Sequence, residues 1–347
     1  MSASQPLRVA VVGAGAFGRN HLRVYRELEQ AGQAVQLTGV VDRDPATLAA
    51  ASEKFGVPGF ESIEACLAAT GKLDAASICV PTVHHATAAA PLLAAGVDLL
   101  VEKPLAANLA DADRILELAR AHNRIVQAGH LERFNPAVTA ARSQLHQPMF
   151  FEAHRLSVFT PRSLDVDVVL DLMIHDLDIV LSLVASPVRE VRAVGLPVLS
   201  RKVDIANVRL EFENGCVANF TASRVSTERV RKLRFFQPHQ YLSLDFARQD
   251  LLMIDVTAAA GMDPAQLAAL AQLAQQAGQQ HPSAGLSLKK VPVETGEPLR
   301  LEIESFLNAV RNRTRPLVSA EDGRAALALA LEINQAIAAH ATRTGLG

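Results

Sequence analysis

The chain has 347 residues, of which 49% are hydrophobic, and a formal net charge of −2 at pH 7. One hydrophobic core seldom grows beyond about 250 residues, so this length predicts two domains with sizeable cores. The weak net charge gives no indication of a nucleic-acid or membrane-surface partner. Cys66, Cys79 and Cys216 form no CxxC pair and are expected to be reduced. With neither a signal peptide nor a long apolar run, we expect a cytoplasmic protein.

The first apolar run, Leu7–Val12, predicts a strand and is followed at once by Gly13-Ala14-Gly15-Ala16-Phe17-Gly18 and a helical pattern over Arg19–Ala31. GxGxxG between a strand and a helix is typical of a dinucleotide-binding turn. Its glycines permit the tight turn and a close approach of the pyrophosphate, and the helix N-terminus supplies amide donors. Gly13, Gly15, Ala16, Phe17 and Gly18 are therefore predicted to bind a dinucleotide. The alternative is a strand–helix turn that is merely tight.

The second predicted strand, Val35–Val41, ends at Asp42, 24 residues after Gly18. An acidic side chain here accepts hydrogen bonds from the adenosine ribose and repels a 2′-phosphate. The adjacent Arg43 could instead stack on adenine or bind that phosphate. We favour NAD over NADP as the cofactor.

Strands and helices alternate as far as residue 128. Further strands are expected over residues 58–60, Ala75–Val80, Leu99–Val101 and Arg124–Ala128. This alternation predicts an α/β fold in which residues 1–128 form an N-terminal Rossmann dinucleotide-binding domain with a doubly wound parallel sheet.

Ligands bind such sheets at the carboxyl ends of the strands. Glu102 and Lys103 follow a buried strand, and Pro104 fixes the chain behind them. Lys103 is either a working cation or a solvated loop charge. The run from Pro81 and Thr82 to His84 and His85 follows the preceding strand, and we expect one histidine, assigned as His85, to contact the cofactor.

Residues 129–347 are predicted to form a C-terminal α+β domain. Strand patterns recur from Val191 to Phe246, with an Asn214-Gly215 hairpin turn, and predict a large, mostly antiparallel sheet. Its broad face favours a homodimer or homotetramer. The closing helices, Glu302–Val310 and Ala320–Ala341, are expected to pack back on the first domain.

An apolar helix predicted over Val168–Val184 carries Asp171, His175 and Asp178 at i, i+4 and i+7, on one face. Ionisable groups on a buried helix are costly unless they are paired or used in chemistry. The interpretations are a catalytic pair or a satisfied core His–Asp hydrogen bond. No further ligands follow at a suggestive spacing, so no metal is expected.

Taken together, these motifs resemble the glucose-fructose oxidoreductase/inositol dehydrogenase family (Gfo/Idh/MocA) over essentially the whole chain. The matching pieces are Gly13–Gly18, Pro81–His85, Glu102-Lys103-Pro104 and Asp171-xxx-His175. The resemblance implies an NAD(P)-dependent oxidoreductase in which Lys103, Asp171 and His175 form the catalytic group at the nicotinamide. Met173 stands where many members carry glycine, which puts the shape of the pocket wall in doubt.

Two stretches, Gly129–Pro136 and Leu170–Asp178, are similar to the bacterial UDP-N-acetylglucosamine 3-dehydrogenase branch of that family. The similarity implies oxidation of the sugar 3-hydroxyl, followed by a partner aminotransferase that makes a 3-amino sugar for lipid A. Because phosphates bind cations, diphosphate contacts are predicted for three arginines, with Asn135 beside them. These arginines are Arg133, Arg155 and Arg162.

Three alternatives to these assignments remain open. Arg133 and Asn135 could belong to a capped crossover whose charges pair with each other. The substrate could be a free sugar or inositol. A non-catalytic dinucleotide-sensing protein is the third alternative, although it would not need Lys103, Asp171 and His175 together.

Overall fold

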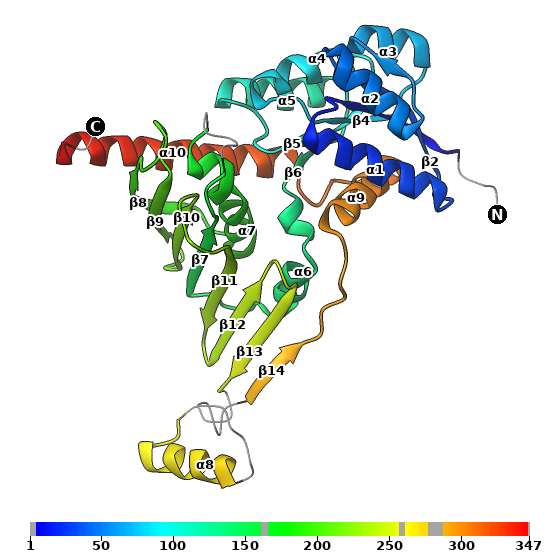
Figure 1. Cartoon of the computed structure of the whole chain (residues 1–347). Coiled ribbons are helices and arrows are strands. Elements are labelled where there is room, and N and C mark those ends of the chain that lie inside the picture. The colour runs from blue at the N-terminus through cyan, green and yellow to red at the C-terminus, as the bar shows by residue number, and fades with distance from the viewer. Residues whose placement is uncertain (1–4, 161–165, 257–260, 277–286, 346–347) are drawn as a thin grey trace. The chain divides into compact units, whose positions relative to one another are not determined.

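The computed structural model describes residues 5–160, 166–256, 261–276 and 287–345. They form two compact units (Figure 1). The first unit runs to Phe134 and takes in Glu297–Ala328, and the second comprises Asn135–Gly296 and the chain from Leu329 onward. The boundary thus falls at Phe134 rather than at residue 128. Within the described ranges, no helix is long and apolar enough to cross a membrane.

The first unit contains a six-stranded sheet in the order β3-β2-β1-β4-β5-β6, in which all neighbouring strands are parallel. The strands are β1 (Leu7–Val12), β2 (Val35–Val41), β3 (Gly59–Phe60), β4 (Ala75–Ile78), β5 (Asp98–Glu102) and β6 (Val126–Gly129). This is the Rossmann order, and it confirms the predicted fold. The order reverses between β1 and β4, so the ligand crevice is expected at their carboxyl ends.

Helices connect these strands, and several begin at a side-chain cap. Asp44, Ser62 and Asn108 each accept a backbone N–H in the first turn of α2, α3 and α5, respectively. The helices are α1 (Ala16–Gln30), α2 (Pro45–Phe55), α3 (Ile63–Thr70), α4 (His85–Ala94), α5 (Leu109–Ala121) and α9 (Pro298–Asn312). Helix α10 (Ala320–Thr344) begins in the first unit and ends in the second.

One apolar core joins α1, α9 and the sheet of the first unit. Leu22 and Leu28 from α1 lie with Ile303 and Phe306 from α9 in the same buried cluster as Val9 of β1. Each fully buried aliphatic or aromatic side chain contributes about 1.5–3 kcal/mol to folding. This packing explains why a helix from the end of the chain belongs to the first unit.

The second unit contains an eight-stranded sheet in the order β14-β13-β12-β11-β7-β10-β9-β8. Only β7 and β10 pair in parallel among the described strands of this sheet. The strands are β7 (Phe150–Leu156), β8 (Val188–Leu196), β9 (Ile205–Phe212), β10 (Val217–Ser223), β11 (Val230–Gln237), β12 (Gln240–Asp245), β13 (Asp250–Asp255) and β14 (Ser287–Val291). The mostly antiparallel sheet confirms the prediction. The sequence analysis missed β13 and β14; β14 is an edge strand whose short, lysine-bearing sequence carries a weak strand signal.

Among the described residues, three helices and a π-helical turn lie wholly within the second unit, which also takes in the end of α10. They are α6 (Pro136–Gln144), the π turn η3 (Val169–Met173), α7 (Ile174–Val184) and α8 (Pro264–Gln276). The helix predicted over Val168–Val184 is confirmed in its extent, and its first turn, Val169–Met173, is π-helical. Oδ1 of Asp167 caps that turn by accepting the backbone N–H groups of Val169 and Leu170 at 3.0 and 2.9 Å.

Candidate functional site

The three glycines of the Gly13–Gly18 turn have different surroundings. Gly13 has φ +95°, and a Cβ there would lie 2.7 Å from the carbonyl carbon of Cys79. A Cβ on Gly18 would lie 1.8 Å from the carbonyl oxygen of Gly13, whereas a Cβ on Gly15 would meet nothing within 4 Å. Close packing of the chain therefore requires the first and third glycines. The second leaves the open approach that a pyrophosphate needs.

Asp42 ties the end of β2 to this turn. Its Oδ2 accepts the backbone N–H of Ala14 at 2.7 Å, and its Oδ1 accepts that of Asp44 at 2.9 Å. The carboxylate is half-buried, and Arg43 beside it is exposed. Asp42 thus holds the turn in shape and also presents negative charge where a ribose would lie.

A cavity of about 310 Å³ opens at the carboxyl ends of β1, β2 and β4. Gly13, Gly15, Asp42, Arg43 and Pro81, all predicted from the sequence, line it. His84, one of the two histidines considered in the sequence, also lines the cavity, and further lining residues were not predicted, namely Glu61, Ser62, Ile63, Glu64 and Thr87. The signal for the first four was the helix cap that follows β3. The position at the switch point, the open Gly15 and the acidic Asp42 fit the adenosine and pyrophosphate of a dinucleotide.

Three predicted cofactor residues are absent from the lining of this cavity but follow lining residues in the sequence. Ala16 and Phe17 are exposed in the first turn of α1, and Thr82 begins the short helix Thr82–His84. Cys79 lines the cavity, but burial, together with Glu102 and Glu302, raises the pKa of its thiol well above the usual value. The thiol therefore stays protonated and does not act as a nucleophile.

His85 belongs to the scaffold. The side chain is fully buried, with Nδ1 3.0 Å from the carbonyl oxygen of Pro104 and Nε2 3.0 Å from that of Val80. Burial lowers the pKa of the ring, although the carbonyl contacts oppose the shift. The imidazole thus ties the chain after β4 to the chain after β5. The assignment of His85 to the cofactor is corrected accordingly, because the exposed neighbour His84 lines the cavity instead.

Lys103 lies directly after β5, half-buried, with a cis peptide bond to Pro104. The preceding Glu102 is buried, and its Oε1 accepts a hydrogen bond from Nε2 of His21 at 2.9 Å. Oε2 of Glu102 accepts the backbone N–H of Lys103 at 3.3 Å. A Cβ at Gly129 would lie 3.0 Å from Oε1 of Glu102, so glycine leaves room for this carboxylate. Glu102, held by His21, therefore fixes the backbone at Lys103.

The sequence analysis missed His21. It lies three residues after Gly18 in the first turns of α1, and its side chain is fully buried. Its ring centroid is 5.5 Å from that of Phe17 in the glycine-rich turn. A histidine among the buried positions of this amphipathic helix was the available signal.

Asp171 and His175 belong to the second unit. Asp171 lies on the π turn and is partly exposed, while His175 lies in the first turn of α7 and is 9% exposed. The number of residues per turn changes between the π turn that carries Asp171 and the α-helix that carries His175 and Asp178. Asp178 is buried. Short π segments occur frequently at functional sites.

The side chain of Arg155 pairs with a carboxylate on α7. Its Nε and Nη2 donate to the two carboxylate oxygens of Asp176 at 2.8 and 2.9 Å, and the guanidinium lies 5.1 Å from the ring centroid of Phe246. The side chains of Arg155 and Asp176 are 5% and 4% exposed. A bidentate, buried pair of this kind is a strong interaction. The prediction that Arg155 binds a substrate phosphate is corrected, since this pair holds the residue that follows His175.

The other predicted substrate contacts are buried or lie outside the described ranges. Oδ1 of Asn135 accepts the backbone N–H of Ala137 at 3.1 Å and caps α6, and its Nδ2 donates to the carbonyl of Phe246 at 3.1 Å. Arg133 is 6% exposed. These environments agree with the capped crossover that the sequence left open. Arg162 lies outside the described residues.

The Rossmann order, the glycine-rich turn and the cavity at the switch point are the features of a dinucleotide-binding protein. Residues 7–130 match the model of the oxidoreductase family with an NAD-binding Rossmann fold, and residues 124–237 match the GFO/IDH/MocA C-terminal domain. The chain belongs to the Gfo/Idh/MocA family of NAD(P)-dependent dehydrogenases, which confirms the resemblance noted in the sequence.

Known relatives agree with this membership. The chain is 34% identical to the UDP-N-acetylglucosamine 3-dehydrogenase of Acidithiobacillus ferrooxidans over 97% of this chain and 99% of that protein. A solved structure of that enzyme superposes with a TM-score of 0.83 at 32% identity, covering 96% of this chain and 98% of that one. An inositol 2-dehydrogenase of Leifsonia xyli is 31% identical over 55% of this chain and 57% of that protein. Levoglucosan dehydrogenase, solved with NADH and levoglucosan, shares the fold at 18% identity, a TM-score of 0.78 and coverage of 96% and 98%.

Proposed function

We propose that this protein oxidises the 3-hydroxyl of UDP-N-acetylglucosamine to a ketone with NAD as the oxidant. The observation that carries the proposal is the similarity to a UDP-N-acetylglucosamine 3-dehydrogenase along nearly the full length of both chains. The two stretches that pointed to this branch in the sequence, Gly129–Pro136 and Leu170–Asp178, lie inside that match.

The proposed reaction uses Lys103, His175 and Asp171. His175 takes the hydroxyl proton, because an imidazole titrates near the working pH. The Lys103 ammonium donates a hydrogen bond to the reacting oxygen and stabilises the negative charge that develops there. Asp171 orients His175 or binds a neighbouring hydroxyl. The nicotinamide, when bound, accepts the hydride from carbon 3. An exchange of the parts of Lys103 and His175 is the alternative assignment.

Asp42 supports the choice of NAD over NADP. Its carboxylate lines the cavity beside the glycine-rich turn and would repel a 2′-phosphate. Arg43, also in the lining, is a neighbour that would favour the phosphate. Cofactor-binding roles are proposed for Gly13, Gly15, Gly18, Asp42 and Arg43.

The wider setting follows from the chemistry of the product. A 3-keto nucleotide sugar is the substrate that an aminotransferase needs to make a 3-amino sugar, so we place such an enzyme downstream, on a route to lipid A in the cytoplasm. A homodimer or homotetramer, formed through the broad sheet of the second unit, is part of the same proposal.

The test is an absorbance assay for NADH with purified protein, NAD and UDP-N-acetylglucosamine. An aminotransferase and its amine donor trap the ketone, because alcohol oxidation by NAD alone lies uphill. NADH formation that requires the UDP-sugar supports the proposal. Parallel reactions with NADP in place of NAD measure the cofactor preference, and Lys103→Met protein serves as the matched inactive control.

A second candidate is a dehydrogenase of inositol or a free sugar, which the similarity to the Leifsonia xyli inositol 2-dehydrogenase favours. NADH formation from inositol or free sugars, together with silence on UDP-sugars, would establish it. Binding of NAD without turnover of any sugar would instead favour the dinucleotide-sensing protein.

A further inference from the structure

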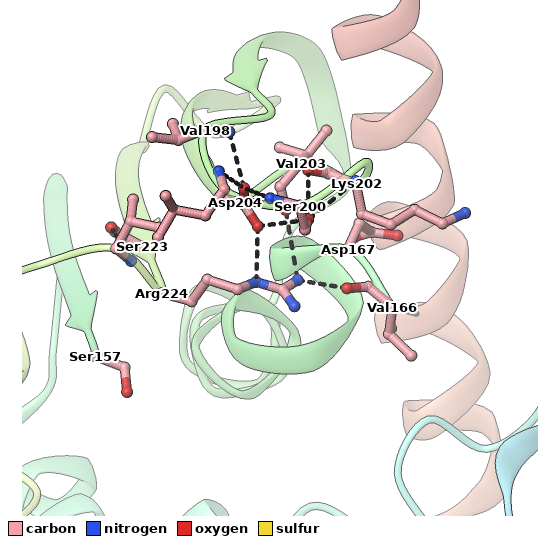
Figure 2. A network of polar contacts seen from close by, with 12 residues as sticks. Ser157, Val166, Asp167, Val198, Ser200, Lys202, Val203, Asp204, Ser223 and Arg224 are labelled. Atoms are coloured by element: carbon pink, nitrogen blue, oxygen red, sulfur yellow. Dashed lines mark hydrogen bonds and ion pairs between the residues drawn. The ribbon is translucent and has the colours of Figure 1, made fainter. Parts of the chain in front are cut away.

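Asp204, directly before β9, is fully buried and organises the turn in front of it (Figure 2). Its Oδ2 accepts the backbone N–H groups of Val198, Leu199 and Ser200 at 2.8, 2.7 and 2.8 Å. Its Oδ1 accepts the hydroxyl of Ser200 at 2.7 Å. Burial raises the pKa of this carboxyl, but the hydrogen bonds outweigh burial and lower the pKa to about 2. Asp204 is therefore a fixed negative charge inside the second unit.

Arg224, directly after β10, faces that charge. Its Nε lies 3.5 Å from Oδ1 of Asp204, and its backbone N–H donates to the carbonyl of Asp204 at 2.9 Å. Its Nη2 donates to the carbonyl of Val166 and lies 3.5 Å from that of Val203. Figure 2 shows the guanidinium between Asp204 and the chain at Val166. Arg224 is 5% exposed, so this bridge is shielded from water.

Val166 opens the segment that carries Asp171 and His175. Two residues on, the backbone N–H of Val168 donates to the carbonyl of Val203 at 2.9 Å. Oδ2 of Asp167 accepts from Nδ2 of Asn334 on α10 at 3.0 Å, and the carbonyl of Asp167 accepts the backbone N–H of Asp171 at 3.0 Å. The start of the π turn is thus held from three sides, and Asp171 lies one hydrogen-bonded turn beyond it.

Arg155 and Arg224 reach this segment from the same place in the sheet. Arg155 pairs with Ala222 in the register of β7 and β10, two residues before Arg224 in the neighbouring strand. Arg155 donates hydrogen bonds to the carboxylate of Asp176, just after His175. Arg224 donates a hydrogen bond to the carbonyl of Val166, before Asp171. The parallel strands β7 and β10 therefore place one buried guanidinium at each end of the segment from Val166 to Asp176.

We propose that Arg224 and Asp204 are positioning residues that fix the start of the π turn and thereby set the placement of Asp171 and His175. Asp204 holds the guanidinium, and the guanidinium holds the chain at Val166. The inference rests on the proposed function, since it concerns side chains that function assigns to the reaction.

The test compares Arg224→Gln and Arg224→Lys with a matched control, Arg313→Gln. Arg313 pairs with the buried Asp98 in the first unit, so its loss removes one cation from a buried carboxylate there, and Arg124 remains 4.0 Å from that carboxylate. For Arg224→Gln we expect kcat to fall about 10- to 100-fold, because small misplacements of reacting groups cost that much. The pH dependence of kcat/KM should shift with the environment of His175. The Kd for NAD should stay within about twofold, as should kcat of the control. Arg224→Lys, which keeps one donor and the charge, should regain part of the loss.

Hydrogen–deuterium exchange supplies a readout that needs no substrate. Arg224→Gln should lose protection in peptides covering residues 166–176, while the glycine-rich turn keeps its protection. Unchanged protection together with wild-type kcat and pH profile would overturn the inference. If Arg224→Gln fails to fold, the near-isosteric Asp204→Asn takes its place, with the same expected results. Wild-type inactivity on every sugar would overturn the proposed function. The exchange data would still test, without any substrate, whether Arg224 anchors residues 166–176.

Discussion

The two units hold their predicted site residues in different ways. In the first unit, backbone packing holds the glycine-rich turn, since close contacts fix Gly13 and Gly18 and Asp42 ties the turn to β2. In the second, the segment with Asp171 and His175 depends on buried ion pairs, Arg155–Asp176 and Arg224–Asp204. Backbone packing of this kind, such as the close approach of Gly13 to Cys79, tolerates few substitutions but involves no buried charge. Ion pairs need partners from distant strands, and each leaves a costly charge when its partner is lost.

Lys103→Met should have the largest effect. Without the ammonium, nothing on this side chain stabilises the charge that develops on the reacting oxygen, so kcat should fall about 10²- to 10⁴-fold. Steady-state kinetics with NAD and UDP-N-acetylglucosamine measure it, and the Kd for NAD controls for cofactor loss. Near-normal turnover would remove Lys103 from the reaction and shift the chemistry to the second unit.

Arg155→Met tests the ion pairs of the second unit. It leaves the carboxylate of Asp176 buried without its bidentate partner, so the free energy of unfolding should fall by about 3–5 kcal/mol. Urea denaturation measures the loss. The double variant Arg155→Met/Asp176→Leu should recover much of it, because no buried charge remains. A loss below about 1 kcal/mol for the single variant would contradict the contrast between the units.

Asp204→Asn tests the buried ion pairs of the second unit by the pH dependence of the free energy of unfolding. The folded-state pKa of Asp204, about 2, lies below its usual value of 3.8. The carboxylate therefore stabilises the fold above about pH 4, and this stabilisation is lost as the pH falls toward 2. The difference in free energy of unfolding between wild type and Asp204→Asn should shrink by about 2 kcal/mol between pH 5 and pH 2. A difference independent of pH would show that the charge is not what holds the turn.

Gly15→Ala and Gly18→Ala test the separate roles of two glycines in the backbone packing of the first unit. A methyl group at Gly15 meets open space, so the Tm should stay unchanged, but it would block a pyrophosphate and raise the Kd for NAD by about tenfold or more. At Gly18 the methyl group would collide with the carbonyl of Gly13, so the Tm itself should fall. Calorimetry and cofactor titration separate the two effects. Equal behaviour of both variants would refute the different parts given to these glycines.

The features that could be predicted from the sequence are those that local chemistry encodes. The alternation of strands and helices, the Gly13–Gly18 turn, Asp42 at the end of its strand and Lys103 before Pro104 are each written in a short run of residues. Steric limits on the backbone and the twofold or 3.6-fold periodicity of side chains act within such runs, which is why the Rossmann domain and the family could be predicted.

Which charged groups stabilise the scaffold could be seen only in the folded chain. Arg155 was predicted to bind phosphate and His85 to contact the cofactor, but one pairs with Asp176 and the other with carbonyl groups of two separate loops. His21 stood out only as a histidine at a buried helix position, and no local pattern showed that Glu102 is its partner or that Asp204 pairs with Arg224. A lone charged residue has the same sequence pattern whether its partner is water, substrate or a distant side chain. That partner is chosen when the chain folds, because burial makes an unpaired charge too costly to keep.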